Sequence, residues 1–153
     1  LRAAEEFEIE LSIEATTFEG KTDEESLKFM QLLNREMSPE DLERFRHASV
    51  EIMPMGVLRM GNGRTVVAGG LLAEMGLQVT AVAKADRSTI EFRMDCTAGD
   101  DGDIPASARS QSHTVSVGKT LGFTAFGSEV FLVTPRIVER GKKPAGEDPK
   151  KAE

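Results

Sequence analysis

The sequence predicts an α+β fold: a mostly antiparallel sheet or sandwich of about six strands, with two short helices near the N-terminus. Three observations predict it. Residues 7–15 alternate between apolar and polar side chains, as a half-buried strand does. Two helix start signals follow, at residues 22–25 and 38–41. From residue 50 onward, short alternating segments are separated by turns that contain glycine, which is typical of antiparallel strands.

The first strand places apolar side chains at the odd positions from Phe7 to Ala15. Its other face carries three glutamates, Glu8, Glu10 and Glu14. Because an unpaired strand edge invites pairing with another chain, charged residues often protect such edges. We therefore expect this acidic strand to be a protected edge and not a seam between subunits.

The two helices are predicted from their caps. Thr22 and Glu25 have the spacing of a capping box, and apolar residues at helical spacing carry the first helix to about Arg35. Residues 38–41 supply an N-cap serine, a proline at the first helical position and two acidic residues in the first turn. This second helix should end near His47.

The remainder of the chain predicts strands. Residues 50–54 form a short extended piece that Pro54 should stop, because proline cannot donate a ladder hydrogen bond. Three antiparallel pairs follow, two of them as hairpins around the turns Gly61-Asn62-Gly63 and Gly118-Lys119. The paired segments are 57–60 with 65–68, 77–83 with 90–96, and 115–117 with 121–125.

The last strand is different because Val130 to Val133 is continuously apolar. Such a run predicts a central strand that is covered on both faces. Pro135 follows the run and should mark the point at which the strand bends or leaves a partner.

Composition limits the possible functions. The 153 residues suffice for one domain, predicted to span 1–140, with a strand and helix lead-in at 1–37, a β core at 38–140 and a disordered charged tail at 141–153. A net charge of −7 argues against a nucleic-acid partner. The single cysteine allows no internal disulfide. No apolar run approaches the ~18–20 residues of a spanning helix, and membrane association is left open.

Candidate sites have simpler structural explanations. The glycines of "GNGRTVVAGG" precede a β-like run, whereas a dinucleotide site needs a helix there. Cys96 is in phase with a core face, and nothing places His113 or His47 beside a nucleophile. The aspartates at 100, 101 and 103 lack the spacing of a calcium loop. We therefore assign no catalytic, cofactor-binding or metal-binding residue.

The order of motifs resembles the C-terminal β-domain of the secretin family, the ring-forming outer-membrane channels of type II and III secretion and type IV pilus systems. The resemblance covers residues 38–139: a helix and "VEIMP", then "GNGRTVVAGG", then the long pair in 75–99, and a closing "GKT" turn with "VTPRIV". The residues that match the family motifs are Pro54, Gly61, Asn62, Gly63, Gly76, Gly118, Lys119, Thr120, Val133, Thr134, Pro135 and Arg136.

The resemblance implies a non-enzymatic assembly domain of a bacterial envelope secretion or pilus apparatus. It would act by forming a homo-oligomeric ring or channel, with itself and other envelope proteins as partners, in the periplasm or outer membrane. The chain lacks the Ile-Pro-containing segment that secretins usually carry before the last strand, and it has no Trp or Tyr. Two alternatives therefore stay open: a soluble, pore-less periplasmic interaction module, and a small ligand-binding protein with a pocket around His113 and Cys96.

Overall fold

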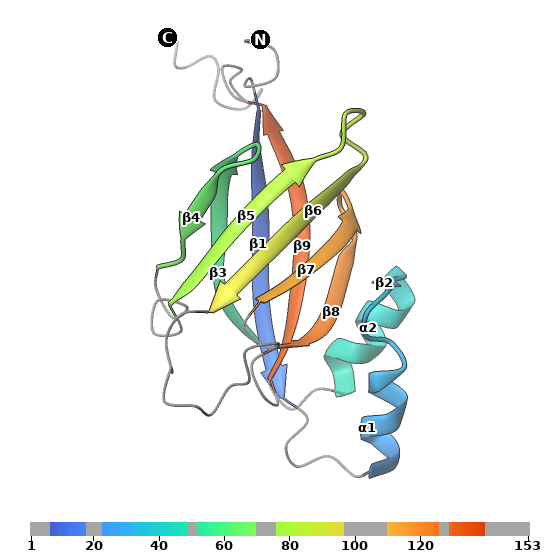
Figure 1. The fold of residues 1–153 in the computed structure, drawn as a ribbon. Coiled ribbons are helices and arrows are strands. Elements are labelled where there is room, and N and C mark those ends of the chain that lie inside the picture. The colour runs from blue at the N-terminus through green and yellow to red at the C-terminus, as the bar shows by residue number, and fades with distance from the viewer. Residues whose placement is uncertain are drawn as a thin grey trace, which may run out of the picture.

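Two antiparallel sheets face each other across one apolar core in the computed structural model (Figure 1). The structure describes residues 7–17, 23–48, 52–69, 76–96, 110–125 and 129–139. Sheet A has the strand order β2-β8-β9-β1-β3, and sheet B has the order β4-β5-β6-β7. The elements are β1 (Phe7–Thr17), α1 (Asp23–Met30), β2 (Glu36–Met37), α2 (Pro39–Ala48), β3 (Met53–Gly61), β4 (Thr65–Val67), β5 (Leu77–Ala83), β6 (Thr89–Cys96), β7 (Ser110–Ser116), β8 (Thr120–Ala125) and β9 (Glu129–Glu139).

The predicted fold class is wrong. The described residues form nine strands in two sheets of five and four, where the sequence predicted about six strands, and the fold is mainly β instead of α+β. Strand β2 has no counterpart in the prediction, whereas the predicted segment 57–60 and the end of the predicted piece 50–54 belong to the single strand β3. Strands β3 to β9 follow one another in chain order around the core, and β9 then pairs with β1.

Strand β1 lies between β9 and β3, so it is a central strand and the prediction of a protected edge is wrong. The alternation itself is confirmed, because the odd-numbered side chains from Phe7 to Ala15 are buried. On the outer face, Glu10 accepts a hydrogen bond from Arg59 of β3 at 3.1 Å. Glu14 accepts two from Arg46 of α2, at 2.8 and 3.2 Å. These carboxylates tie neighbouring elements to β1.

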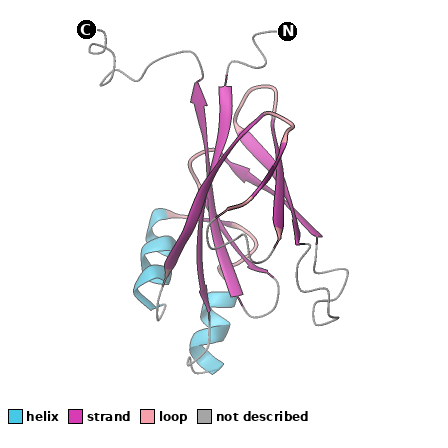
Figure 2. Ribbon diagram, turned by 90° about the vertical axis from the view of Figure 1, so that its left-hand side faces the viewer, coloured by secondary structure: helices cyan, strands magenta, loops and turns pink. Residues whose placement is uncertain are grey.

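The run Val130 to Val133 is covered on both faces, as predicted. Phe131 and Val133 join the core between the sheets, while Val130 and Leu132 pack in a second cluster on the far side of sheet A. The second cluster also contains Leu33, Met37 and Phe45. Figure 2 shows the helices on this far side of sheet A, away from sheet B.

Pro135 marks the point at which β9 leaves one of its two partners. Pairing with β8 ends at Val133, whereas pairing with β1 continues to Glu139. The Pro135 carbonyl accepts a hydrogen bond from the Gly118 N–H at 2.8 Å, so the proline nitrogen faces the β8 side too. The missing N–H therefore removes no bond from the β1 ladder.

The helix predictions are confirmed in part. The Ser38 hydroxyl accepts the Asp41 N–H at 3.0 Å, which is the predicted cap of α2. Helix α1 ends at Met30, earlier than the predicted Arg35. Thr22 and the side chain of Glu25 lie outside the described residues, as does the predicted tail at 141–153.

The two predicted hairpins are in fact crossings between the sheets. β3 belongs to sheet A and β4 to sheet B, and likewise β7 belongs to sheet B and β8 to sheet A. The third predicted pair, β5 with β6, is confirmed with a register from Leu77↔Cys96 to Ala83↔Ile90. A glycine-containing turn thus reverses the chain without fixing which sheet the next strand joins.

Pro54 does not stop its strand, contrary to the prediction. β3 runs through it to Gly61, with Pro54 opposite Glu14 next to a register shift. Because β3 is the last strand of sheet A, a missing N–H is tolerated there. The edge that the prediction assigned to β1 therefore belongs to β3.

Candidate functional site

The two sheets meet along two lines, and these differ in how they are sealed. We call the meeting of β7 with β8 the closed seam. The Glu36 carboxylate of β2 accepts the Ser116 N–H of β7 at 2.6 Å, and Gln111 donates to the Thr124 carbonyl of β8 at 3.3 Å. Hydrogen bonds from Ser116, the hydroxyl first and then the N–H, hold the pKa of Glu36 below its ordinary value. Side chains thus satisfy backbone groups where the strands do not pair.

Aromatic packing fills the closed seam from inside. The His113 ring stacks on Phe123 with centroids 4.0 Å apart, and Phe92 lies 5.7 Å from His113. The His113 Nε2 lies 3.1 Å from the Gln111 side-chain oxygen. Burial lowers the pKa of His113, because a charged imidazolium loses its hydration there. This histidine is a packing residue of the seam.

We call the meeting of β3 with β4 the open seam. The turn between them is well held: Asn62 accepts the Ala83 N–H at 2.7 Å, and Gly63 donates to the Ala81 carbonyl at 2.7 Å. Gly63 has a φ of 78°, which glycine adopts without strain. Away from this turn, β3 and β4 separate into different sheets.

The open seam exposes apolar side chains. Val57 of β3 is 60% exposed and Val67 of β4 is 69% exposed, and Met53 at the start of β3 is also exposed. Three of the six exposed large apolar residues in the described part of the chain lie on these two strands. β3 and β4 are each the last strand of a described sheet, but Val57 lies opposite Ser12 on the outer face of sheet A and Val67 lies opposite Gln78 on the outer face of sheet B, so these two side chains point away from each other.

The backbone groups of β3 that point away from β1, and that pair with no other described strand, can be identified from the ladder. Residues of an antiparallel strand point their N–H and C=O alternately to the two sides. The Pro135 carbonyl points toward β8, so the backbone groups of its register partner Leu11 point the other way, toward β3. There Leu58 is the register partner of Leu11, and its own backbone groups point back toward β1. Val57 and Arg59, one residue to either side of Leu58, therefore point their backbone groups away from β1. This edge can accept hydrogen bonds from another chain.

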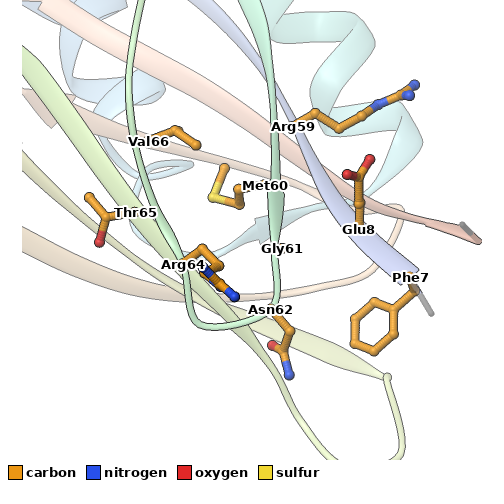
Figure 3. A pocket seen from close by; sticks show the side chains of 9 residues that line it. All are labelled: Phe7, Glu8, Arg59, Met60, Gly61, Asn62, Arg64, Thr65 and Val66. Carbon is orange, nitrogen blue, oxygen red and sulfur yellow. The ribbon is translucent and has the colours of Figure 1, made fainter. Parts of the chain in front are cut away.

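A cavity of about 370 Å³ lies at the turn end of the open seam (Figure 3). Met60 and Val66 extend into the space between β3 and β4, whereas Arg59 and Glu8 lie on the other side of β3. Arg59 is engaged by Glu10 at 3.1 Å, and Arg64 is exposed in the turn. The lining residues are Phe7, Glu8, Arg59, Met60, Gly61, Asn62, Arg64, Thr65 and Val66.

The structure brings two of the predicted family motifs together and leaves the others apart. The Gly118-Lys119-Thr120 turn meets the closing strand: Gly118 bonds Pro135, and the Thr120 and Thr134 hydroxyls are 2.7 Å apart. Val133 is buried and Arg136 is exposed on the outer face of β9. The remaining motif residues lie elsewhere: Pro54 in β3, Gly61-Asn62-Gly63 at the open seam, and Gly76 before β5.

The considered catalytic residues do not converge. His113 lies opposite Phe92 in the β6–β7 ladder, and Cys96 is four residues further along β6, about 13 Å away. His47 is exposed at the end of α2. The aspartates at 100, 101 and 103 and the Cys96 side chain lie outside the description. In the described part of the chain, no three His, Cys, Asp or Glu residues could jointly hold a metal ion.

Sequence reasoning missed the open seam. Val57 and Val67 look like core residues of a hairpin, and only the strand order shows that each lies at a sheet edge. None of the helices described has the length and apolar character to cross a membrane. Comparison of the chain with models of protein families, with curated proteins and with solved structures finds no match.

Proposed function

We propose that this chain is a non-enzymatic, secretin-like assembly domain of a bacterial envelope secretion or pilus apparatus, which works by forming a homo-oligomeric ring or channel. The observation that carries the proposal is that β3 and β4, each the last strand of a described sheet, carry the exposed apolar residues Met53, Val57 and Val67. Exposed apolar groups next to a free edge are the features by which β-domains join. The order of the motifs up to "VTPRIV" supports the choice of family.

The test compares two valines that differ in their strand environment. Val57 is on the edge strand β3, while Val82 is exposed by 44% on β5, which is paired on both sides. Light scattering and negative-stain microscopy should show a multi-subunit ring for the parent chain and for Val82→Lys, and monomers for Val57→Lys. A parent chain that is monomeric at high concentration would overturn the proposal.

A pore-less periplasmic module is the second candidate, and the outward face of β6 favours it. Glu91 and Arg93 are exposed there, and Arg93 pairs with Asp95 at 3.1 Å, so this face is suited to water. Detergent dependence separates the two candidates. A channel partitions with membranes and needs detergent to stay dispersed, whereas the module assembles in buffer alone.

A further inference from the structure

The turn between β3 and β4 contains the dipeptide that is most prone to spontaneous deamidation, an asparagine followed by a glycine. The chain has two asparagines, Asn34 and Asn62, and only Asn62 precedes a glycine. Deamidation begins when the backbone nitrogen of the following residue attacks the side-chain amide carbon. Glycine hinders this attack least, because it has no Cβ. Both Asn62 and Gly63 are exposed, so water reaches the reactive pair.

The reaction needs water and no oxidant or reductant. The Gly63 nitrogen forms a bond to the Asn62 Cγ while the bond from Cγ to Nδ2 breaks, and the Gly63 proton leaves with the amide nitrogen as ammonia. The product is a five-membered succinimide ring. Water then breaks the bond from nitrogen to Cγ, which gives aspartate, or the bond from nitrogen to the backbone carbon, which gives isoaspartate. In isoaspartate the backbone runs through the side chain and is one methylene longer.

The geometry of the turn keeps the two reacting atoms apart. The Arg64 N–H donates to the Gly61 carbonyl at 3.0 Å, and Gly63 has a φ of 78° whereas the φ of Asn62 is not positive. These are the features of a type II turn, whose first central residue, here Asn62, has a ψ of about +120°. The ring requires the Asn62 Cβ and the Gly63 nitrogen to be nearly eclipsed about the Cα–C bond. At that ψ they are about a third of a full rotation apart.

Two hydrogen bonds to β5 oppose the rotation that would bring these atoms together. The Gly63 N–H donates to the Ala81 carbonyl at 2.7 Å, and the Asn62 Oδ1 accepts the Ala83 N–H at 2.7 Å. The first bond is lost when Gly63 gives up its proton, and the second holds the amide group whose carbon is attacked. The turn must therefore detach from β5 before the ring can close.

We propose that Asn62 is a site of spontaneous deamidation that the folded turn protects, so that it is modified only when the turn opens away from β5. Opening of this kind is local and does not require the whole domain to unfold. An aspartate at position 62 keeps an acceptor for the Ala83 N–H. Isoaspartate lengthens the backbone between β3 and β4 and moves Gly63 away from Ala81. The inference does not depend on the assembly function proposed above.

The experiment follows deamidation of the folded chain and of the urea-unfolded chain in the same mildly alkaline buffer. Peptide mapping by mass spectrometry detects the mass gain at residue 62. It is preferred to a general isoaspartate assay, because Asp101-Gly102 can isomerise without any change of mass. Asn62 should react at least about tenfold more slowly in the folded chain. Hydrogen exchange of the Gly63 N–H should show the same degree of protection, because it requires the same opening.

Two glycine variants form a matched pair for this test. A Cβ at Gly63 or at Gly69 would meet nothing within 4 Å, but only Gly63 has a positive φ. Gly63→Ala strains the closed turn, so the ratio of the unfolded to the folded rate should fall by a factor of about 5–30. The ratio is the readout because alanine slows the attack in both states. Gly69→Ala should leave the ratio unchanged, and circular dichroism confirms that each variant is folded.

The remaining outcomes would overturn the proposal. Equal rates in the folded and unfolded parent chain would mean that the turn gives no protection. An unfolded chain in which Asn62 stays intact would mean that the reactive pair does not react. A Gly63 N–H that is far more protected than Asn62, or a ratio that falls equally in Gly63→Ala and Gly69→Ala, would show that opening of the turn does not control the reaction.

Discussion

The closed and open seams join the same two sheets, and both begin at a glycine-containing turn, yet one is sealed and the other is not. At the closed seam, Glu36 and Gln111 bond backbone groups of the opposite element. His113 and Phe123 stack beneath these bonds. At the open seam, the side-chain bond of Asn62 holds the turn, and beyond it Val57 is exposed.

The difference lies in side chains and not in the strand count. Two sheets of a sandwich cannot complete their ladders where they diverge, so each meeting line leaves backbone groups without a strand partner. Polar side chains satisfy these groups at the closed seam. At the open seam, Val57 and Val67 are apolar and point to opposite outer faces, so neither side chain bonds a backbone group there.

The largest expected effect comes from truncating a buried aromatic side chain at the closed seam. Phe123 is buried between Phe92, His113 and Phe131. Phe123→Ala should lower the free energy of unfolding by about 3–5 kcal/mol, because it leaves a cavity that packed neighbours cannot fill. Urea denaturation measures the loss.

Met60→Ala is the matched change at the open seam. Met60 is 3% exposed and lines the existing cavity there. Met60→Ala should lower the free energy of unfolding by about 2 kcal/mol, which is the low end for such a truncation. The loss is small because water can enter the enlarged space, so that no empty cavity is left. Equal losses for Phe123→Ala and Met60→Ala would mean that the open seam is as tightly packed as the closed one.

A pair of glycines gives a smaller and sharper contrast. A Cβ on Gly122 of β8 would lie 2.8 Å from the Met37 Cε and 3.0 Å from a Leu132 methyl, whereas a Cβ on Gly69, next to β4, would meet nothing within 4 Å. Gly122→Ala should therefore destabilise the fold by about 1–3 kcal/mol, because the packed neighbours must shift. Gly69→Ala should be neutral or stabilise by up to about 1 kcal/mol, because it stiffens the unfolded chain. Thermal unfolding of both variants would contradict this if Gly69→Ala were the more damaging.

The position of each strand in the sequence could be predicted more readily than the strand with which it pairs. The alternation from Phe7 to Ala15 and the apolar run at Val130–Val133 both predict burial, because burial leaves its period in the residues themselves. The Ser38 cap is likewise local. Sheet membership is not local: the turns at Gly61–Gly63 and Gly118-Lys119 have hairpin residues but lead into another sheet.

The candidate site was missed for the same reason. Leu27 and Met30 have the spacing of a core-facing helix stripe, and Val57 and Val67 that of strand cores, but all four are exposed. An apolar side chain that stays exposed leaves the same pattern in the sequence as one that the domain buries. The acidic face of β1 led to the opposite error, because it predicted an edge strand where the structure has a central one. Glu10 and Glu14 form ion pairs with Arg59 of β3 and Arg46 of α2. Only the strand order separates these cases.

The smallest expected effect is a pH dependence of the closed seam. Burial lowers the pKa of His113 in the folded protein below its ordinary value of 6.5, so the unfolded chain binds a proton at a higher pH than the folded one does. The contribution of neutral His113 to the free energy of unfolding is therefore fully present above pH 6.5. It is lost as the pH falls from 6.5 toward the lower pKa of the folded state. Glu36 does not confuse the result, because its pKa is lowered from 4.5 and it affects stability only below that value.

The measurement is the urea midpoint between pH 8 and pH 5, for the parent chain and for His113→Gln. The variant should be less stable at every pH, since it loses the stack on Phe123, but its midpoint should change less with pH because the titrating ring is gone. The slope, and not the absolute stability, is thus the readout for His113. A parent midpoint that rises as the pH falls, or an identical slope in His113→Gln, would show that the closed seam admits a charged imidazole, and the contrast with the open seam would then rest on packing alone.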